Sequence, residues 1–414
     1  MAAKIRDNLI DGWRENLARC LRCGLCREVC PAFRATASER FSPRGRLALL
    51  EAALEGEPPA EEFGAPFLES LAYCLSCRAC AERCPSGVAG DVLVLAAREA
   101  GLCRGGFPFF KSWAYRLALG RPRLLALLTR LLYVAQQAHL LPFALWFFGL
   151  PPRLALPKLE AKPFDASREQ YFIPAEGTEW RGRVTYFAGC GATYLYPSTA
   201  RAVVELLTRA GYLVFVPAAR RCCGIPALAN GDVDLARELA ARNVAALAGD
   251  EPVVVDCGSC GTMLTYYYND VLEVPGAASF KERVKDFTEL IPPDVIEARD
   301  DGRVTYHDPC HLARGLGVTA EPRTLLSKIG RLVELEAPGA VTCCGGAGAY
   351  GLTYDDVFAK IGGEKAAAVE ATGADVVATG CPACVLYINE ALRRRGAKAE
   401  ARHTAEVLNE GGGP

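Results

Sequence analysis

The sequence predicts an α/β protein with an α-helical domain at its N-terminus and two repeated small α/β domains in its second half. Three observations lead to this prediction. Two runs of four cysteines lie between residues 20 and 84. A later pattern of strands, helices and cysteines occurs twice, over 184–260 and 304–384. The intervening stretch, 105–180, contains no cysteine and has a different composition. We therefore expect four regions, at 1–104, 105–180, 181–300 and 301–414.

Composition indicates a folded protein and limits its partners. Of 414 residues, 51% are hydrophobic and 23% are charged, which is unlike the composition of a disordered chain. The formal net charge is −1, so no overall basic field favours binding to nucleic acid.

Cysteine is unusually common, at 19 residues against 2 methionines. The odd count and the polar start MAAKIRDNLIDGW, which does not resemble a secretory signal, argue against an extracellular disulfide framework. We expect the protein on the reducing, cytoplasmic side of the membrane, where clustered cysteines serve metal binding or catalysis.

The N-terminal region carries two runs, CLRCGLCREVCP and CLSCRACAERCP, with the spacing C-x2-C-x2-C-x3-C-P. This spacing is typical of ferredoxins with two 4Fe-4S cubanes, in which three cysteines of one run bind a cluster and the fourth binds its neighbour. The predicted ligand sets are Cys20, Cys23, Cys26 and Cys84 for one cluster, and Cys74, Cys77, Cys80 and Cys30 for the other. Two zinc sites are the alternative, but zinc motifs usually present separated C-x2-C pairs. Helical apolar spacing over 47–54 and 67–71 predicts a helical ferredoxin domain.

The middle region begins with an amphipathic pattern over Trp113–Gln137. No formal charge occurs over 131–152, a length that could span a bilayer, but Gln136, Gln137, His139 and Pro142 interrupt it. Three interpretations stay open for residues 124–150: a face packed on this chain or a partner, an anchor in the membrane interface, or a spanning helix. The Pro-rich stretch 151–174 is expected to be a linker.

The second half of the chain is an internal repeat, and each copy contains one pair of adjacent cysteines followed by glycine. VTYFAGC at 184–190 and VTYHDPC at 304–310 predict matching strands, and each is followed by a helix, a CCG, a second helix, a short strand and C-x2-C. Alternating strands and helices predict that the thiols gather at strand ends and helix N-termini, where thiolate is stabilised. The glycine after each pair allows a positive φ. The two sets of five are Cys190, Cys222, Cys223, Cys257 and Cys260, and Cys310, Cys343, Cys344, Cys381 and Cys384.

Five thiolates exceed the four that a cubane uses. Vicinal disulfides at the CC pairs are an alternative, although they would leave the other three cysteines of each set unexplained. Gly346, Gly348 and Gly351 satisfy G-x-G-x-x-G but follow two of the clustered cysteines, so we expect no dinucleotide site there.

Three other kinds of residue are candidates for a role. His307 and His311 bracket Cys310, and each could orient a ligand, transfer a proton or simply be hydrogen-bonded at a strand end. Arg44 and Arg46 could be solvated charges, or could tune a cluster or dock a partner. Cys103 belongs to no motif and is expected to be a buried spare thiol.

The repeats resemble the CCG-type cysteine-rich domain of the heterodisulfide reductase and glycolate oxidase iron-sulfur subunit families, with the pattern C-x(31-38)-CC-x(33-34)-C-x2-C. In the second copy the later spacing is 36 residues, slightly longer than that pattern. The resemblance implies that each set of five cysteines holds a non-cubane 4Fe-4S cluster, in addition to the two cubanes of the ferredoxin domain.

From about residue 15 onward the chain is similar to the glycolate oxidase iron-sulfur subunit, with FSPRGRLALL between the ferredoxin runs, CPSG at 84–87 and a late His403. This implies an electron-transfer subunit of a 2-hydroxyacid dehydrogenase complex of the glycolate or lactate type, peripheral on the inner face of the membrane. A separate FAD-linked subunit would supply electrons that pass towards quinone, with no FAD or NAD in this chain. The intact pairs CGSC and CPAC are closer to the catalytic subunit of heterodisulfide reductase, which implies an alternative function, reduction of a disulfide.

Overall fold

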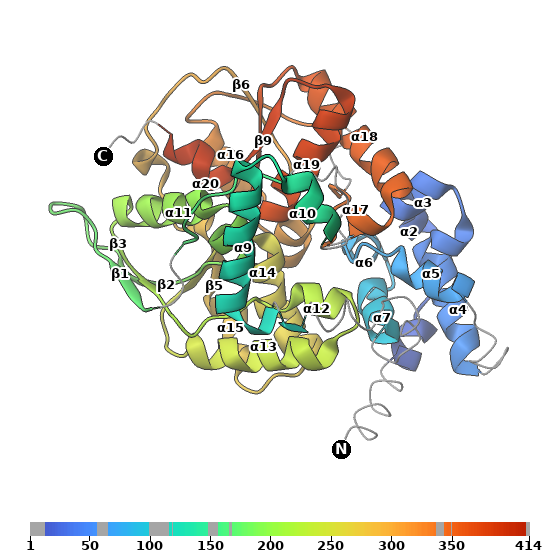
Figure 1. Ribbon diagram of the computed structural model, residues 1–414. Coiled ribbons are helices and arrows are strands. Elements are labelled where there is room, and N and C mark those ends of the chain that lie inside the picture. The colour runs from blue at the N-terminus through green and yellow to red at the C-terminus, as the bar shows by residue number, and fades with distance from the viewer. Residues whose placement is uncertain are drawn as a thin grey trace.

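The computed structural model describes residues 13–55, 65–98, 116–117, 119–147, 156–164, 168–336, 343–348 and 350–410. A helical N-terminal region lies beside two sheets that are flanked by helices (Figure 1), so the predicted fold class is confirmed. Cys103 and Trp113 lie outside the described residues.

The N-terminal region consists of short helices joined by cysteine-bearing loops. They are α2 (Leu25–Glu28), α3 (Pro31–Thr36), η1 (Glu39–Phe41), α4 (Pro43–Glu55), α5 (Ala65–Ala72), α6 (Ala79–Glu82) and α7 (Gly90–Ala97). The helical spacing over 47–54 and 67–71 is confirmed, because α4 and α5 contain it. Leu47, Leu50, Leu71 and Leu93 are buried in one apolar core that holds these helices together.

The middle region forms α9 (Pro122–Gln137) and α10 (Leu141–Phe147), which lie against one another on the outside of the molecule (Figure 1). The helical conformation is interrupted between them at His139, which has a φ of 58°. Within the part of the chain that the structure describes, no helix combines the length and the apolar composition needed to cross a bilayer.

The first repeat contains a five-stranded sheet in the order β1-β3-β2-β4-β5. Its strands are β1 (Gln170–Phe172), β2 (Gly182–Phe187), β3 (Tyr212–Val216), β4 (Val253–Val255) and β5 (Val284–Asp286). Only β1 pairs antiparallel, at the edge next to β3, so the stretch expected to be a linker contributes a strand. The longer helices are η3 (Gly191–Leu195), α11 (Pro197–Arg209), α12 (Ile225–Ala229), α13 (Val233–Ala246), α14 (Gly258–Thr262) and η4 (Met263–Val271). Short turns follow at η5 (Ala277–Ser279), α15 (Phe280–Arg283), η6 (Phe287–Glu289) and η7 (Pro293–Val295).

The second repeat contains a parallel sheet in the order β7-β6-β8-β9, which is the order of the matching strands in the first repeat. Its strands are β6 (Arg303–Tyr306), β7 (Arg331–Val333), β8 (Val376–Thr379) and β9 (Glu400–His403). The helices are η8 (Leu312–Leu316), α16 (Ala320–Leu326), α17 (Tyr350–Thr353), α18 (Asp355–Thr372), α19 (Pro382–Arg395) and α20 (Thr404–Asn409). The structure therefore shows the internal repeat, while the domain boundaries stay predictions.

The two repeats share one apolar core. Val184 and Val204 of the first repeat are buried in the same cluster as Val304 and Val407 of the second. α20 packs against α11, where the hydroxyls of Ser198 and Thr199 both donate to Glu406. The repeats therefore form a single body around their cysteines.

Candidate metal centres

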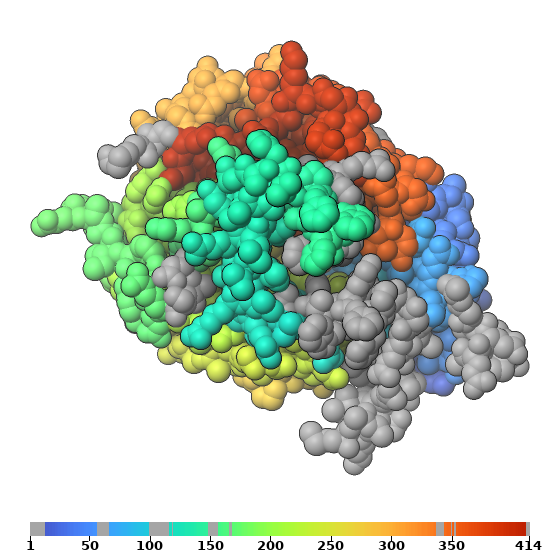
Figure 2. Space-filling view, viewed as in Figure 1, coloured from blue at the N-terminus to red at the C-terminus, as the bar shows by residue number. Residues whose placement is uncertain are grey.

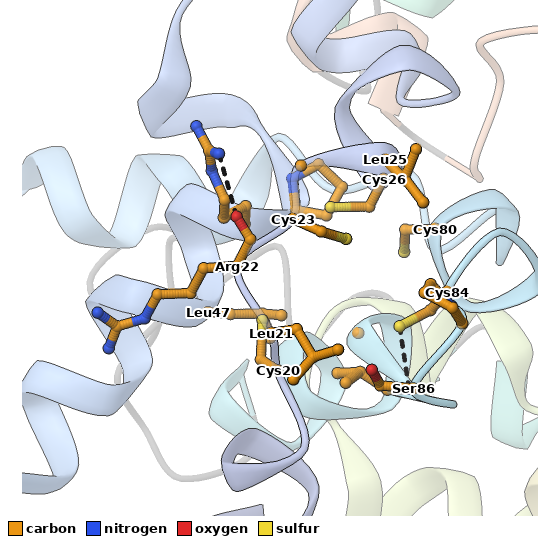
Figure 3. A pocket seen from close by; sticks show the side chains of 16 residues that line it. Cys20, Leu21, Arg22, Cys23, Leu25, Cys26, Leu47, Cys80, Cys84 and Ser86 are labelled. Atoms are coloured by element: carbon orange, nitrogen blue, oxygen red, sulfur yellow. Dashed lines mark hydrogen bonds between the residues drawn. The ribbon is translucent and has the colours of Figure 1, made fainter.

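The first N-terminal site is a pocket that Cys20, Cys23, Cys26 and Cys84 line together (Figure 3). Gly24, with a φ of 87°, immediately precedes α2. Its left-handed conformation lets the loop before α2 wrap around the pocket. Cys84 comes from the second run but lies with three cysteines of the first. This placement supports the predicted crossed ligand set, whose metal binding stays a prediction.

The second N-terminal site surrounds the buried side chain of Arg46, whose Nε donates to Ser70 O at 2.6 Å. Burial opposes the charge on Arg46, but the thiolates of Cys74 and Cys30 raise its pKa. Arg46 is 2% exposed, so it is not a solvated charge. Arg44 lines the first pocket and pairs with Glu39 at 2.8 Å.

In the first repeat, five thiols meet at the carboxyl ends of β2, β3 and β4. Cys190 precedes η3, Cys257 precedes α14, and the adjacent Cys222 and Cys223 precede α12. Gly224, with a φ of 94°, provides the predicted turn after the pair. The Sγ atoms of Cys222 and Cys190 are 3.8 Å apart. Hydrogen bonds from the thiols of Cys222 and Cys260 lower the pKa of Cys223 to about 5.

The second repeat builds the same arrangement, with Gly345 at a φ of 84° after its cysteine pair. Hydrogen bonds from Cys310 and Cys344 hold the pKa of Cys343 well below its usual value. Hydrogen bonds from Cys257 and Cys384 do the same for the pKa of Cys381. The Sγ atoms of Cys257 and Cys381 are 3.8 Å apart, so the two sites are in direct contact.

The chemistry of these sulfur atoms fits iron–sulfur clusters. The described cysteines are free thiols, including both adjacent pairs. A hydrogen bond to a neighbouring thiol, together with burial, raises the pKa of Cys190 and of Cys310. So many buried sulfur atoms cannot all ionise side by side unless cations compensate the charge, and bound iron would provide that compensation.

The two candidate histidines differ in their surroundings. His311 is fully satisfied: its Nδ1 lies 3.0 Å from Ser259 Oγ, and its Nε2 lies 2.9 Å from Ser76 O. It therefore joins both repeats to the N-terminal region. His307 is buried, and neither ring nitrogen has a hydrogen-bond partner among the described residues. One ring nitrogen of His307 and the Sγ atoms of Cys344 and Cys384 lie within 4.8 Å of one another.

The late histidine, His403, ends β9 and contacts the first repeat. Its Nε2 lies 2.7 Å from Asp256 O, and its Nδ1 accepts from Ala405 N at 3.2 Å. With Nδ1 accepting, Nε2 carries the proton and donates it to Asp256 O. His403 is therefore a structural link beside Cys257.

Three buried polar residues near the sulfur atoms were not predicted from the sequence. Asp256 precedes Cys257 and accepts a hydrogen bond from Tyr186, and burial raises the pKa of both side chains. Lys365 of α18 is 0% exposed. Burial lowers the pKa of Lys365 to about 8, while the charges of Cys344 and Cys343 act to raise it. Alignment of the two repeats is the sequence signal that could have found Lys365, because it follows Cys344 by 21 residues and Asn243 follows Cys223 by 20.

The glycines of G-x-G-x-x-G serve to pack an aromatic ring. A Cβ at Gly346 would lie 2.3 Å from the ring of Tyr387, and one at Gly351 would lie 2.5 Å from it. The Tyr387 hydroxyl donates to Gly348 O at 2.6 Å. These contacts account for the motif without a dinucleotide.

Comparison with known proteins agrees with this geometry. Residues 184–265 and 304–389 each match the family described as "Cysteine-rich domain", and residues 16–88 match "4Fe-4S dicluster domain". The chain is 31% identical to the "Probable glycolate oxidase iron-sulfur subunit" of Bacillus subtilis, over 96% of this chain and 94% of that protein. The chain belongs to the glycolate oxidase iron-sulfur subunit family.

Two other relatives are also similar to this chain. A fumarate reductase (CoM/CoB) subunit of Methanothermobacter marburgensis is 28% identical over 92% of this chain and 69% of its own length. "Lactate utilization protein A 2" of Bacillus mycoides is 33% identical over 55% of this chain and 98% of its own length. The predicted resemblance to the glycolate oxidase family is thereby confirmed, and the relatives include a reductase subunit.

Proposed function

We propose that this protein is the iron–sulfur electron-transfer subunit of a 2-hydroxyacid dehydrogenase complex of the glycolate or lactate type. It would receive electrons from a separate FAD-linked subunit and pass them towards quinone. Clusters bound at its four sites, two cubane and two non-cubane, would supply one-electron redox chemistry.

The observation that carries this proposal is the unbroken sequence of sulfur sites. Cys80 lines the first pocket although it is predicted to serve the second, so these two sites are neighbours. Cys77, whose pKa is raised by burial and then by Cys343, connects the second N-terminal site to the second repeat. Cys381 and Cys257 connect that repeat to the first. A chain of adjacent sites is what a protein that conducts electrons requires.

The partners follow from what surrounds this path. A flavin would be bound by another subunit, and the packing of Tyr387 against the glycine motif supports this proposal. The surface of α9 and α10 would contact that subunit or the inner face of the membrane. These helices lie on the face of the molecule seen in Figure 2. Large apolar side chains are exposed on them, including Trp146 at 64% and Phe147 at 72%. Residues 121–147 contain three arginines and no carboxylate, which favours a negatively charged surface.

The second candidate function is reduction of a disulfide, as in heterodisulfide reductase. It is favoured by the direct contact of two complete five-cysteine sites at Cys257 and Cys381. A disulfide could meet both sites at once only if it enters at this contact.

Iron analysis of anaerobically purified protein tests the cluster content. Four 4Fe-4S clusters require about 16 irons per chain, whereas about 12 would mean that one repeat is vestigial. About 8 irons would leave only the ferredoxin pair and would overturn the proposal for the repeats. The reduced protein should then be oxidised rapidly by a quinone analogue. A spectral change of the repeat clusters on addition of a disulfide would instead favour the second function.

A further inference from the structure

The two five-cysteine sites share a strand order but not their surroundings. The strand sequence VTYF of the first repeat corresponds to VTYH in the second, so Phe187 and His307 occupy the same position. Both side chains are fully buried. Phe187 belongs to an apolar cluster that includes Cys222 and Cys223. His307 places an imidazole without a partner among the described residues beside Cys344 and Cys384.

A second difference lies on the helix that follows each cysteine pair. Asn243 of α13 is neutral and fully used: it accepts from Arg221 N at 2.7 Å and donates to Cys222 O at 3.0 Å. With one extra residue between the cysteine pair and this point of the helix, Asn243 corresponds to Lys365 of α18, which is equally buried. Burial opposes the charge of its amine, and the thiols of Cys344, Cys343 and Cys384 favour that charge.

The other charges near the two sites increase this difference. The first site has a buried cation, Arg220, which donates to Ala188 O at 3.2 Å, but it also has the buried carboxyl of Asp256. Negative charge on Asp256 raises the pKa of Cys190 and of Cys257 in the first set, and Asp256 also interacts with Cys381 of the second set. In the second repeat, Gly380 takes the place of Asp256 before the C-x2-C pair.

The acidic group near the second site is neutralised elsewhere. The carboxylate of Asp308 accepts two hydrogen bonds from Arg323, at 2.8 and 2.7 Å. A further cation, Arg314, lies beside Cys77 and Cys310 and pairs with Glu82 at 2.8 Å. The second site therefore has Lys365 and Arg314 beside its thiols, whereas the first has Arg220 and the carboxyl of Asp256.

We propose that Lys365 and His307 hold the cluster of the second repeat at a higher reduction potential than that of the first. Reduction adds negative charge, and a buried ammonium and an imidazole N–H stabilise that charge in a medium of low dielectric constant. The inference rests on the proposed function, because it requires a cluster in each repeat. Since the second site is the one beside Cys77, it would be where an electron from the N-terminal region comes to rest.

The test exchanges residues between matching positions. Lys365→Asn and His307→Phe each install the residue of the first repeat, and the midpoint potentials are measured by EPR-monitored redox titration of anaerobically purified protein. We expect Lys365→Asn to lower one midpoint potential so that the reduction equilibrium falls about tenfold, which is about 59 mV for one electron. His307→Phe should lower the same midpoint. Lys398→Met, which removes an exposed charge of the same sign from the second repeat, should leave all four midpoints unchanged.

Iron content separates the possible failures. Unchanged midpoints in variants that keep about 16 irons would overturn the inference and leave the proposed function standing. A parent protein with about 8 irons would instead remove the proposed function on which the inference rests. If the exchanged variants lose iron, Phe187→His decides the matter. A raised midpoint at the first site supports the role of the imidazole, and an unchanged one overturns it.

Discussion

Asp286 is a fully buried carboxyl at the end of β5, where it caps the turn η6. It accepts hydrogen bonds from Thr288 N at 3.1 Å and from Thr288 Oγ1 at 2.6 Å. Burial raises its pKa to about 7, although the bonds from Thr288 act in the opposite direction. The contribution of Asp286 to the stability of the folded protein therefore depends on pH.

The sign of that dependence yields the first prediction. Between pH 4 and pH 7 the unfolded state loses the Asp286 proton before the folded state does, so the folded protein loses stability as pH rises. Asp286→Asn removes this effect, at about 1.4 kcal/mol per pH unit for the one group. The melting temperature of the variant minus that of the parent should therefore increase from pH 5 to pH 7 and stay constant above pH 7. A difference that stays constant across this range would contradict a raised pKa.

Cys84 is the residue on which the crossed ligand set depends, because it lies with Cys20, Cys23 and Cys26 in one pocket. We predict that Cys84→Ser damages the cluster of that pocket and spares the cluster of the second N-terminal site. Cys77→Ser provides the matched control, because it should damage the second N-terminal cluster. EPR spectra of the two reduced variants distinguish the clusters, and identical losses would show that the ligands do not cross.

At the scale of elements, the two repeats pack tightly against one another between α14 and η8. A Cβ on Gly258 would lie 2.5 Å from Leu312 N, and one on Gly315 would lie 1.7 Å from Thr262 Oγ1. The Thr262 hydroxyl donates to His311 O at 2.7 Å across the same contact. Glycine is needed here because the opposing atoms include backbone, which cannot move aside.

Gly258→Ala should therefore separate the repeats and disturb both five-cysteine sites. Forcing a methyl group into a packed contact typically costs about 1–3 kcal/mol. We expect a lower melting temperature and loss of iron from the repeats, with the two ferredoxin clusters retained. Gly363→Ala on α18 is the control, since nothing lies within 4 Å of its added Cβ. Equal effects of the two substitutions would contradict this account.

The exposed aromatic side chains of α10 carry the prediction about partners. If α9 and α10 contact a membrane or a flavin subunit, replacing Trp146 and Phe147 with Ser should release the protein from that partner without loss of iron. Sedimentation with membranes and co-purification of the flavin subunit measure this. Trp180→Ser, at an exposed tryptophan outside these helices, should have no such effect. Combined loss of iron and folding in the α10 variant would show that the side chains belong to a core.

At the scale of the whole molecule, the sequence predicted the features that depend on nearby residues better than those that depend on contacts between distant residues. The strands before Cys190 and Cys310, the helices around the ferredoxin runs and the turn glycines follow from residues close in sequence, and the structure confirms them. The contact of Cys257 with Cys381 joins residues 124 positions apart and depends on how one repeat docks on the other. Lys365 was missed for a related reason: a lysine on an amphipathic helix usually faces water, and tertiary packing reverses that expectation here.

The packing of α20 on α11 also sets an order of events during synthesis. Ser198 and Thr199 are synthesised about 200 residues before Glu406, the residue that accepts their hydrogen bonds. These hydrogen bonds can therefore form only after Glu406 has left the ribosome. Cys381 likewise emerges long after Cys257. If each site holds a cluster, the ferredoxin segment could be loaded with iron while translation continues, whereas the joined pair of five-cysteine sites would have to be filled on a chain that is almost finished. Machinery that delivers clusters would have to protect the exposed thiols of the first repeat throughout that interval.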